Sequence, residues 1–293
     1  MDIASSSIIL FVINPVSGGI VKTDYPELIR NHFIPTNHVL HFHILSGKDD
    51  TNDIVKIIEK TVPNIVVAVG GDGTISLIAK IIIDTAIQLG IIPSGSANGM
   101  ALELNIPFTL PKAIELIKNG KSQKIDILKI NNKICLHLSD IGINAQLIKY
   151  FEQGKIRGKI GYALVVLKTL FRKKTIFTTI QTDTIEIKRT AFMVVLANAS
   201  KYGTGAVINP LGDLYDGLFE VIIIKKLSLL TLYKMWFKPS SFTSDHIEVF
   251  QAKAVTVEAN RKIHFQIDGE YIGKVQYIRA EILPQQLNIL LPD

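Results

Sequence analysis

The sequence has little cysteine and no long apolar run. Its 293 residues include one cysteine, Cys135, which excludes an intramolecular disulfide and a cysteine-based zinc site and favours a reducing compartment. The richest apolar stretch, residues 75–92, carries Lys80 and Asp84, whereas a membrane-spanning helix needs about 18 largely apolar residues. Asp2 stands where a signal peptide carries positive charge. We therefore expect a cytoplasmic protein that can touch the inner face of a membrane without crossing it.

Charge is sparse and leans to one sign. Charged residues make up 20% of the chain and hydrophobic residues 47%, a composition that excludes a disordered protein and supports a sizeable core. The length predicts about two domains of ~150 residues each. Lys and Arg number 32 against 26 Asp and Glu, for a formal net charge of +6. This balance favours phosphates, membrane headgroups or nucleic acid as partners, but the chain has no nucleic-acid recognition motif.

The first part of the chain alternates β-branched runs with segments of helical spacing. Short strands that alternate with helices are typical of βαβ units and a parallel, Rossmann-like sheet. The predicted strands are residues 8–13, 39–45, 65–69 and 89–92, and the predicted helices are residues 50–60 and 75–83.

The pattern changes near residues 119–124. Beyond this turn, strand-like stretches follow one another, with two helical segments between them, which predicts a mainly antiparallel β-sandwich. The stretches are residues 125–130, 134–138, 176–180, 185–187, 191–197, 218–224, 254–257 and 263–267. We place an α/β domain at residues 1–122 and a β-sandwich domain at residues 123–275.

Two common nucleotide-binding motifs are missing, namely G-x-x-x-x-G-K-[ST] and a G-x-G-x-x-G that follows a strand. Instead, three loops rich in Gly, Ser, Thr and Asn leave the ends of predicted strands, at residues 14–19, 70–74 and 93–99. Each loop alone reads as an ordinary turn. In an open parallel sheet, however, ligands bind at the carboxyl ends of the strands, and glycine amides at a helix N-terminus attract phosphate. Together the loops predict a phosphate-binding site.

The second loop, Gly-Gly-Asp-Gly-Thr at residues 70–74, resembles a signature shared by diacylglycerol kinases, sphingosine kinases and NAD kinases. Other elements of the lipid-kinase pattern stand in order along nearly the whole chain: residues 14–18, 93–98, Asp126, 158–162, 209–218 and the Asp-Gly-Glu at 268–270. The sequence is therefore similar to the bacterial diacylglycerol kinase catalytic domain. That resemblance implies a nucleotide-binding α/β domain, a lipid-binding β-sandwich domain and a C-terminal segment, residues 276–293, that returns to the first domain.

The resemblance also assigns roles. It implies ATP as the phosphate donor, Mg²⁺ as the cofactor and Asp72 as the carboxylate that orients magnesium or the transferring phosphate. Glu270 resembles the catalytic base that accepts the proton of the lipid hydroxyl. The implied nucleotide-binding residues are Asn14, Ser17, Gly18, Ser46, Gly70, Gly71, Asp72, Gly73, Thr74, Ser96 and Asn98. Asp213, Asp216 and the carbonyl of Leu218 match a structural magnesium site, although Asp216-Gly217 reads equally well as a hairpin turn.

The lipid is left open by one departure from the pattern. Bacterial diacylglycerol kinases commonly carry an acidic residue where this chain has Gly99, and residues 95–99 are closer to the pattern of sphingosine and ceramide kinases. The implied reaction is phosphorylation of diacylglycerol to phosphatidic acid, with a sphingoid base or ceramide as the alternative substrate. An acidic residue at 99 would also be expected of a soluble metabolite kinase of the NAD-kinase kind. A nucleotide-binding regulator without catalysis fits the loops but not Glu270.

Two basic segments are candidates for peripheral membrane contact. Residues 225–238 combine apolar, aromatic and lysine side chains, and residues 149–174 are strongly basic. Both patterns can lie at a membrane interface, but both are equally typical of helices with a solvated charged face. The resemblance leaves a homodimer open.

Overall fold

The computed structural model describes residues 6–18, 24–34, 36–152, 175–201, 207–226 and 246–292. The chain divides into two units, Met1–Ile125 with Gln285–Asp293, and Asp126–Pro284. We call them unit 1 and unit 2. The return of residues 285–293 to unit 1 is shorter than the predicted return of 276–293, because residues 276–284 still pair with unit 2 strands. Two predicted elements, residues 158–162 and most of residues 225–238, lie outside the described residues, as do the side chains of most of residues 149–174.

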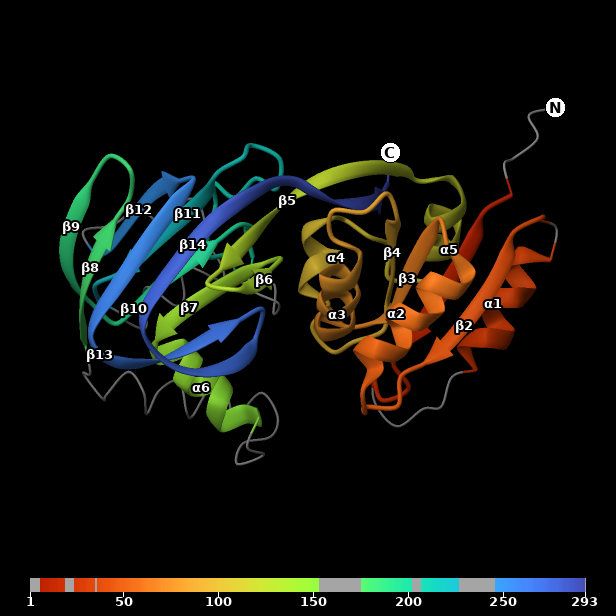
Figure 1. The fold of residues 1–293 in the computed structure, drawn as a ribbon, viewed down its shortest axis with the longest axis horizontal. Coiled ribbons are helices and arrows are strands. Elements are labelled where there is room, and N and C mark those ends of the chain that lie inside the picture. Colours follow the sequence, from red (N-terminus) through yellow and green to blue (C-terminus); the bar gives the residue numbers. More distant parts are fainter. Residues whose placement is uncertain are drawn as a thin grey trace. The chain divides into compact units, whose positions relative to one another are not determined.

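Unit 1 alternates strands and helices, as its sequence pattern predicts (Figure 1). Its strands are β1 (Ile8–Ile13), β2 (Val39–Ile44), β3 (Ile65–Gly70) and β4 (Gln88–Pro93), and its helices are α1 (Tyr25–Phe33), α2 (Asp50–Thr61), α3 (Asp72–Ile82), α4 (Gly99–Glu103) and α5 (Leu110–Asn119). The strands pair in the parallel order β2-β1-β3-β4. The end of the long strand β14 (Glu270–Leu291) then pairs beside β4, with Ile289 opposite Leu89.

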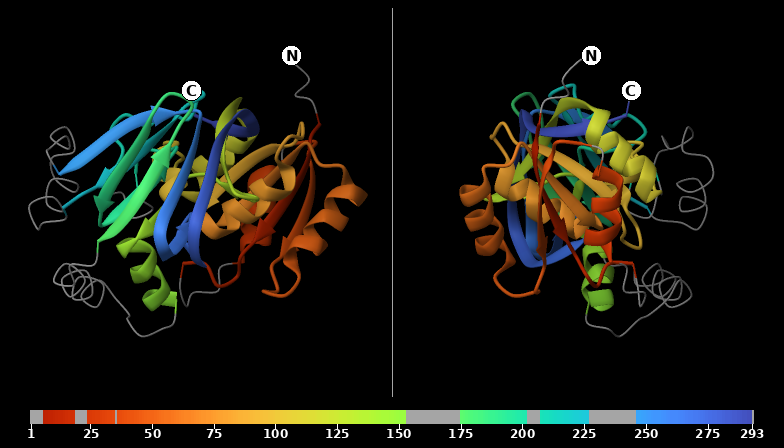
Figure 2. Two further views of the ribbon diagram at one scale, coloured as in Figure 1. Left: turned by 60° about the vertical axis from the view of Figure 1, so that its left-hand side comes forward. Right: turned by 90° about the vertical axis from the view of Figure 1, so that its right-hand side faces the viewer.

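Helices cover both faces of this sheet (Figure 2). Side chains alternate along a strand, and in β1 the residues Ile9, Phe11 and Ile13 pack in one cluster with α1 and α5. Every residue of β3 is buried, as expected for a strand covered on both sides. The sheet is therefore rigid where its strands end and the loops begin.

Unit 2 is an antiparallel β structure. Its strands are β5 (Lys121–Ile130, which begins in unit 1), β6 (Lys133–Cys135), β7 (Leu138–Gly142), β8 (Ile176–Gln181), β9 (Glu186–Ala191), β10 (Met193–Ala197), β11 (Phe219–Ile224), β12 (Ile247–Ala252), β13 (Ala254–Ile267) and most of β14. The main path runs β12-β11-β10-β7-β13-β14, and β5 with β6 and β8 with β9 branch from it. One helix, α6 (Ile143–Glu152), follows β7.

Several strand predictions in unit 2 differ from the structure. The run 134–138 is divided between β6 and β7, and residues 254–257 and 263–267 belong to a single strand, β13. Polar residues between the two runs suggested a break, but the chain continues with a shift of register between Glu258 and Ile263. The polar side chains of Glu258, Asn260, Arg261 and Lys262 at this irregularity are exposed to solvent, so the strand can continue through them.

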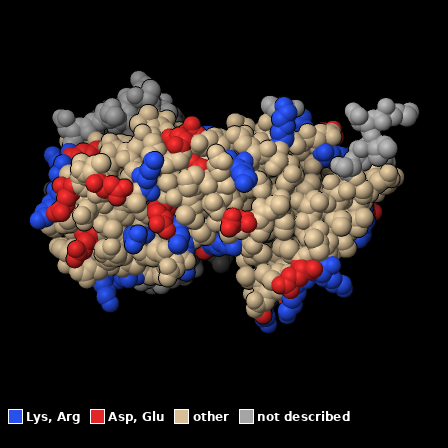
Figure 3. Space-filling view, turned by 45° about the horizontal axis from the view of Figure 1, so that its top comes forward, with Lys and Arg blue, Asp and Glu red and all other residues tan. Residues whose placement is uncertain are grey.

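Among the described residues, no helix is long and apolar enough to cross a membrane. On the face of the molecule drawn in Figure 3, Lys and Arg side chains are scattered among Asp and Glu side chains.

Candidate active site

The three predicted loops meet at the carboxyl end of the unit 1 sheet. The backbone N–H of Asn14, after β1, donates to the carbonyl of Val69 at 2.9 Å, and the N–H of Ser94, after β4, donates to the carbonyl of Gly70 at 2.9 Å. The side-chain amide of Asn14 also donates to Thr74 Oγ1, at 3.3 Å. The loops after β1, β3 and β4 are thus joined directly to one another.

Glycines permit this close approach. A Cβ atom on Gly95 would lie 2.5 Å from the Cα atom of Gly71, and a Cβ atom on Gly18 would lie 2.4 Å from the carbonyl oxygen of Ser94. Both distances are shorter than real Cβ contacts. The loops therefore present backbone to the site rather than side chains, as a phosphate-binding loop requires.

Helix α3 begins inside this loop cluster, with Gly71 as its N-cap. A Cβ atom on Gly73 would meet nothing within 4 Å, so the first turn of α3 opens onto free space. The first amides of an α-helix have no partner within the helix, and the N-terminus carries about half a positive charge. This end of α3 can bind an anion such as a phosphate.

Asp72 lies in that first turn, and its carboxylate points to another helix. Its two oxygens accept hydrogen bonds from the N–H groups of Gly99 and Met100, at 2.9 Å each. Asp72 thus caps the N-terminus of α4 and ties the β3 loop to the β4 loop. Each oxygen keeps a second lone pair, which can face a cation or a phosphate-bound water.

Two of the predicted nucleotide-binding side chains support the loops from within. Thr74 and Asn98 are buried, with relative exposures of 3% and 7%. The Asn98 side chain accepts from the N–H of Gly95 at 2.9 Å and donates to the Gly95 carbonyl at 2.8 Å. These side chains hold the loop backbone in place.

The three predicted serines differ in their surroundings. Ser17 is half-buried and Ser96 is exposed. Ser46 follows β2 in an exposed turn, where its N–H donates to Asp50 Oδ1 at 2.8 Å. That hydrogen bond is the main cause of the lowered pKa of Asp50. The structure therefore gives Ser46 a local role at the start of α2.

In unit 2, Glu270 is the first residue of β14 and is exposed. Asp268 and Gly269 form the two-residue turn before it, with φ angles of 49° and 84°. The carboxylate of Asp268 accepts hydrogen bonds from the N–H groups of Leu136 at 2.9 Å and His137 at 2.8 Å. Asp268 therefore anchors the turn that presents Glu270.

The Cys135 thiol also donates a hydrogen bond to Asp268 Oδ1, at 3.3 Å. Burial, together with the negative charge of Asp268, raises the pKa of Cys135 well above its ordinary value. The thiol is buried, and a raised pKa does not suit a nucleophile, because the thiolate is the reactive form.

The predicted magnesium residues lie in turns. Asp213 accepts from the N–H of Tyr215 and Asp216 accepts from the N–H of Leu218, both at 2.9 Å. Carboxylate and carbonyl oxygens suit a hard cation such as Mg²⁺. Within the described residues, however, no three or more His, Cys, Asp or Glu side chains are grouped to hold a metal ion. The oxygen atoms of these residues are of the kind that binds magnesium, and the two hydrogen bonds are those of ordinary turns.

Asp126 connects this turn to the core. It is fully buried in β5, and its Oδ2 atom accepts from the N–H of Gly217 at 2.6 Å. Next to the turn, burial raises the pKa of Glu220, and the charge of Asp216 raises it further. Glu220 accepts hydrogen bonds from the side chains of Asn209 and Gln251, so this carboxylate also has dedicated donors.

Two polar residues of unit 2 that the sequence did not single out are buried together. Asp140 in β7 and Gln266 in β13 have relative exposures of 1% and 0%. Burial raises the pKa of Asp140 to about 6. The signal available in the sequence is an acidic residue in the middle of a short strand-like run, Leu-Ser-Asp-Ile-Gly at residues 138–142, since buried charges need dedicated partners.

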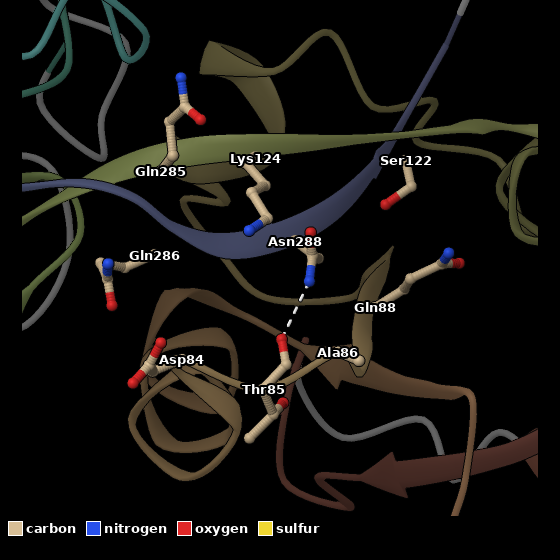
Figure 4. A pocket seen from close by; sticks show the side chains of 9 residues that line it. All are labelled: Asp84, Thr85, Ala86, Gln88, Ser122, Lys124, Gln285, Gln286 and Asn288. Atoms are coloured by element: carbon tan, nitrogen blue, oxygen red, sulfur yellow. Dashed lines mark hydrogen bonds between the residues drawn. The ribbon is translucent and has the colours of Figure 1, made fainter.

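A polar pocket of about 350 Å³ lies in unit 1 at the amino end of β4 (Figure 4). It is lined by Asp84, Thr85, Ala86, Gln88, Ser122, Lys124, Gln285, Gln286 and Asn288. The Asn288 side chain donates to the carbonyl of Thr85 at 2.9 Å. None of the predicted site residues lines this pocket, because they follow the opposite, carboxyl ends of the strands.

Comparison with known proteins agrees with this arrangement. Residues 8–130 match the family described as diacylglycerol kinase catalytic domain, and residues 139–291 match the YegS C-terminal NAD kinase beta sandwich-like domain. A diacylglycerol kinase of Bacillus subtilis (strain 168) is 25% identical over 277 residues, which cover 89% of each chain. A diacylglycerol kinase of Staphylococcus aureus (strain Newman) is 28% identical over 220 residues, which cover 72% of this chain and 70% of that protein.

Solved structures show the same fold. A diacylglycerol kinase from Bacillus anthracis has a TM-score of 0.73 at 17% identity, covering 98% of this chain and 97% of the other. An NAD kinase from Archaeoglobus fulgidus in complex with ATP has a TM-score of 0.55 at 14% identity, covering 96% and 93%. These likenesses confirm the predicted combination of a parallel α/β domain and a β-sandwich.

The fold and the matched domains define a kinase, a phosphotransferase with an alcohol acceptor. The chain belongs to the diacylglycerol kinase family of lipid kinases. The resemblance inferred from residues 14–18, 70–74 and 268–270 is thereby confirmed.

Proposed function

We propose that the chain uses ATP and Mg²⁺ to phosphorylate the primary hydroxyl of diacylglycerol and that the product is phosphatidic acid. The observation that carries the proposal is the meeting of three glycine-containing loops at the open N-terminus of α3. Because the loops approach through backbone, their amides can surround a chain of phosphates. Family membership supplies the acceptor class, a lipid alcohol.

In this proposal the unit 1 loops hold the triphosphate. The amides around Gly71, Gly73 and Gly95 contact phosphate oxygens, and Asn14, Ser17, Gly18, Ser46 and Ser96 complete the nucleotide site. Gly70, Thr74 and Asn98 support the loop backbone and do not contact the phosphates through side chains, since the side chains of Thr74 and Asn98 are buried in the loop structure. Asp72 keeps the β3 and β4 loops together and turns its remaining lone pairs toward the magnesium-bound phosphates.

The reaction joins the hydroxyl oxygen of the lipid to the γ-phosphorus and breaks the bond from that phosphorus to the oxygen that bridges it to the β-phosphate. ADP leaves, and the hydroxyl proton passes to the carboxylate of Glu270. A carboxylate is a weak base for an alcohol, but in a loose transition state the proton leaves late, so Glu270 chiefly orients the hydroxyl. Magnesium, when bound, neutralises phosphate charge. In unit 2, Asp213, Asp216 and Leu218 would hold a structural magnesium ion.

A second candidate substrate is a sphingoid base or ceramide. Gly99 stands where diacylglycerol kinases commonly carry an acid, and its N–H is used by Asp72. The loop therefore brings one carboxylate fewer to the phosphates than the diacylglycerol kinase pattern implies. That difference favours testing both lipid classes side by side.

The test incubates the full chain with labelled ATP, Mg²⁺ and separate mixed micelles of diacylglycerol, sphingosine and ceramide. We expect labelled phosphatidic acid, and no product when EDTA removes the magnesium. If only sphingosine or ceramide becomes labelled, that lipid is the substrate and the proposal of diacylglycerol is wrong. ATP binding without transfer to any lipid would point to a regulator and reject the kinase reaction for this chain.

We also propose that the enzyme works at the inner face of a membrane, with the basic segments 149–174 and 225–238 as its contact. Attraction of a basic residue to an anionic surface contributes about 1 kcal/mol. Co-sedimentation with phosphatidylserine vesicles should fall as salt rises, whereas binding that is indifferent to both salt and phosphatidylserine would reject the electrostatic contact.

A further inference from the structure

The turn that carries Glu270 is held by a second set of contacts, in addition to those of Asp268. The N–H of Gly269, the residue before Glu270, donates to Gln266 Oε1 at 2.8 Å. The other end of the same side chain, Gln266 Nε2, donates to Asp140 Oδ2 at 2.6 Å. A continuous chain of hydrogen bonds thus runs from Asp140 through Gln266 to the backbone beside Glu270.

The two ends of this series of hydrogen bonds determine the orientation of the Gln266 side-chain amide. Asp140 in its ionised form can only accept, and the N–H of Gly269 can only donate. Gln266 must therefore direct its NH₂ group to Asp140 and its oxygen to Gly269, since the flipped amide would place like atoms against both partners. One orientation satisfies both ends.

The residues that form this series of hydrogen bonds are also held firmly by burial and by further hydrogen bonds. Gln266 is fully buried, and its own carbonyl accepts from Ser139 Oγ at 2.6 Å. Asp140 is buried as well and accepts from the N–H of Ala145 at 3.0 Å and from Asn144 Nδ2 at 2.6 Å. Both partners lie at the start of α6. A fully satisfied buried network of this kind rigidifies the residues that it joins.

We propose that Gln266 is a positioning residue for Glu270 and that Asp140 orients Gln266. The Gly269 amide is held by Gln266, and the Asp268 carboxylate is held by the Leu136 and His137 amides. Both central residues of the turn, Asp268 and Gly269, have positive φ, the geometry that suits a two-residue β-hairpin turn, and the two sets of hydrogen bonds fix where that turn presents Glu270. This inference rests on the proposed role of Glu270 in the reaction.

The test compares Gln266→Met in the wild-type enzyme and in Glu270→Gln, with full chains, ATP, Mg²⁺ and diacylglycerol micelles. Methionine keeps the length of the side chain but removes both hydrogen bonds. A misplacement of about 1 Å can cost up to 10²-fold in rate, so we expect kcat to fall about 10- to 100-fold with KM for ATP unchanged. In Glu270→Gln, the same substitution should cause no further loss, because Gln266 acts through Glu270.

Thr178→Val is the matched control. Thr178 is fully buried, and its hydroxyl donates to the Arg189 carbonyl at 3.3 Å in the β8–β9 hairpin. The valine variant therefore also loses a buried hydrogen bond. We expect its melting temperature to fall without a change in kcat.

A second pair of variants serves if Gln266→Met does not fold. Gln266→Glu places a carboxylate against Asp140 and should lower kcat. Adding Asp140→Asn should restore it, because the asparagine NH₂ then donates to the new glutamate and, once the Asn144 amide turns over, also to Asn144 Oδ1. If kcat of the double variant does not recover, the proposal that Asp140 orients Gln266 is wrong.

The outcomes separate the two proposals. If Glu270→Gln is slow but Gln266→Met turns over normally, or if Gln266→Met slows both backgrounds equally, the positioning role is wrong and the proposed function stands. If Glu270→Gln turns over normally, the role of Glu270 is wrong and the positioning role is lost with it.

Discussion

The carboxylate of Asp72 accepts a hydrogen bond from the backbone N–H of Gly99 at 2.9 Å. The bond joins the first turn of α3 to the first turn of α4, so the acidic residue of the Gly-Gly-Asp-Gly-Thr loop also organises the loop after the next strand. The site in unit 1 is therefore one hydrogen-bonded cluster, and a change at Asp72 should reach both loops.

Asp72→Asn should weaken both folding and ATP binding. The new NH₂ group would face the N–H of Gly99 or Met100, leaving a backbone donor without its acceptor, which typically costs about 1 to 3 kcal/mol. Urea unfolding should show this loss, and titration with ATP should show weaker binding. Wild-type values in both measurements would contradict the role of Asp72 as the link between the loops.

Glu270→Gln should preserve folding and lower kcat by about 10²-fold or more, since proton acceptance and hydroxyl orientation contribute up to that order. The side chain is exposed, so the melting temperature should not change. Glu258→Gln, an exposed glutamate on β13, is the control and should keep full activity. Near-normal turnover of the Glu270 variant would remove this residue from the reaction.

Gly95→Ala should abolish ATP binding. The added methyl group would lie 2.5 Å from Gly71 Cα and 2.8 Å from Asn98 Oδ1, so the β3 and β4 loops would be forced apart. Thermal unfolding should show a loss of stability as well. Gly73→Ala is the stability control, because its methyl group meets nothing within 4 Å and alanine favours a helix. Equal melting temperatures for the two variants would refute the close approach of the loops.

The buried Asp140 should make stability depend on pH. Its pKa is raised from 3.8 to about 6 by burial, so the folded state binds the proton more tightly than the unfolded chain. The contribution of Asp140 is therefore greatest below pH ~4 and is lost as pH rises to about 6, a change of roughly 2 to 3 kcal/mol at most.

The measurement for Asp140 is the difference in unfolding free energy between the wild type and Asp140→Asn, determined in urea at pH 4.5, 5.5 and 7. Subtraction removes the effect of other carboxyl groups, such as Asp50, whose pKa is lowered. We expect the advantage of the wild type to shrink as pH rises. A difference that is constant across this range would show that Asp140 titrates normally.

Much of unit 1 could be predicted from the sequence because its signals are local. The strands of residues 8–13, 65–69 and 89–92 are short apolar runs that end in glycine, proline or asparagine, and the structure has strands at all three places. The helices α1 and α5 and the strands β12 and β14 were missed. In α1 only Ile29 and Phe33 are buried, and polar residues occupy much of the nine-residue helix.

The components of the site were predicted to different degrees. The order of the glycine loops along the chain showed that they would gather at one edge, because parallel strands place their carboxyl ends together. The contacts of Asp72 with the α4 amides were not predictable, since they depend on the path of the loop after β4. Asp213 and Asp216 accept hydrogen bonds from nearby backbone N–H groups in turns, and the metal site that they form with Leu218 stays a prediction.

The sequence by itself determined the two kinds of sheet, the loops that reach the edge of the first sheet and the family to which the chain belongs. Periodicity and turn residues act over a few positions, and a motif can be read without knowing what lies beside it. Only the tertiary structure decided that Asp140 meets Gln266, 126 positions away, and that His137 anchors Asp268, 131 positions away. Those pairs depend on the register between β7 and β13, which many distant side chains set together through their packing.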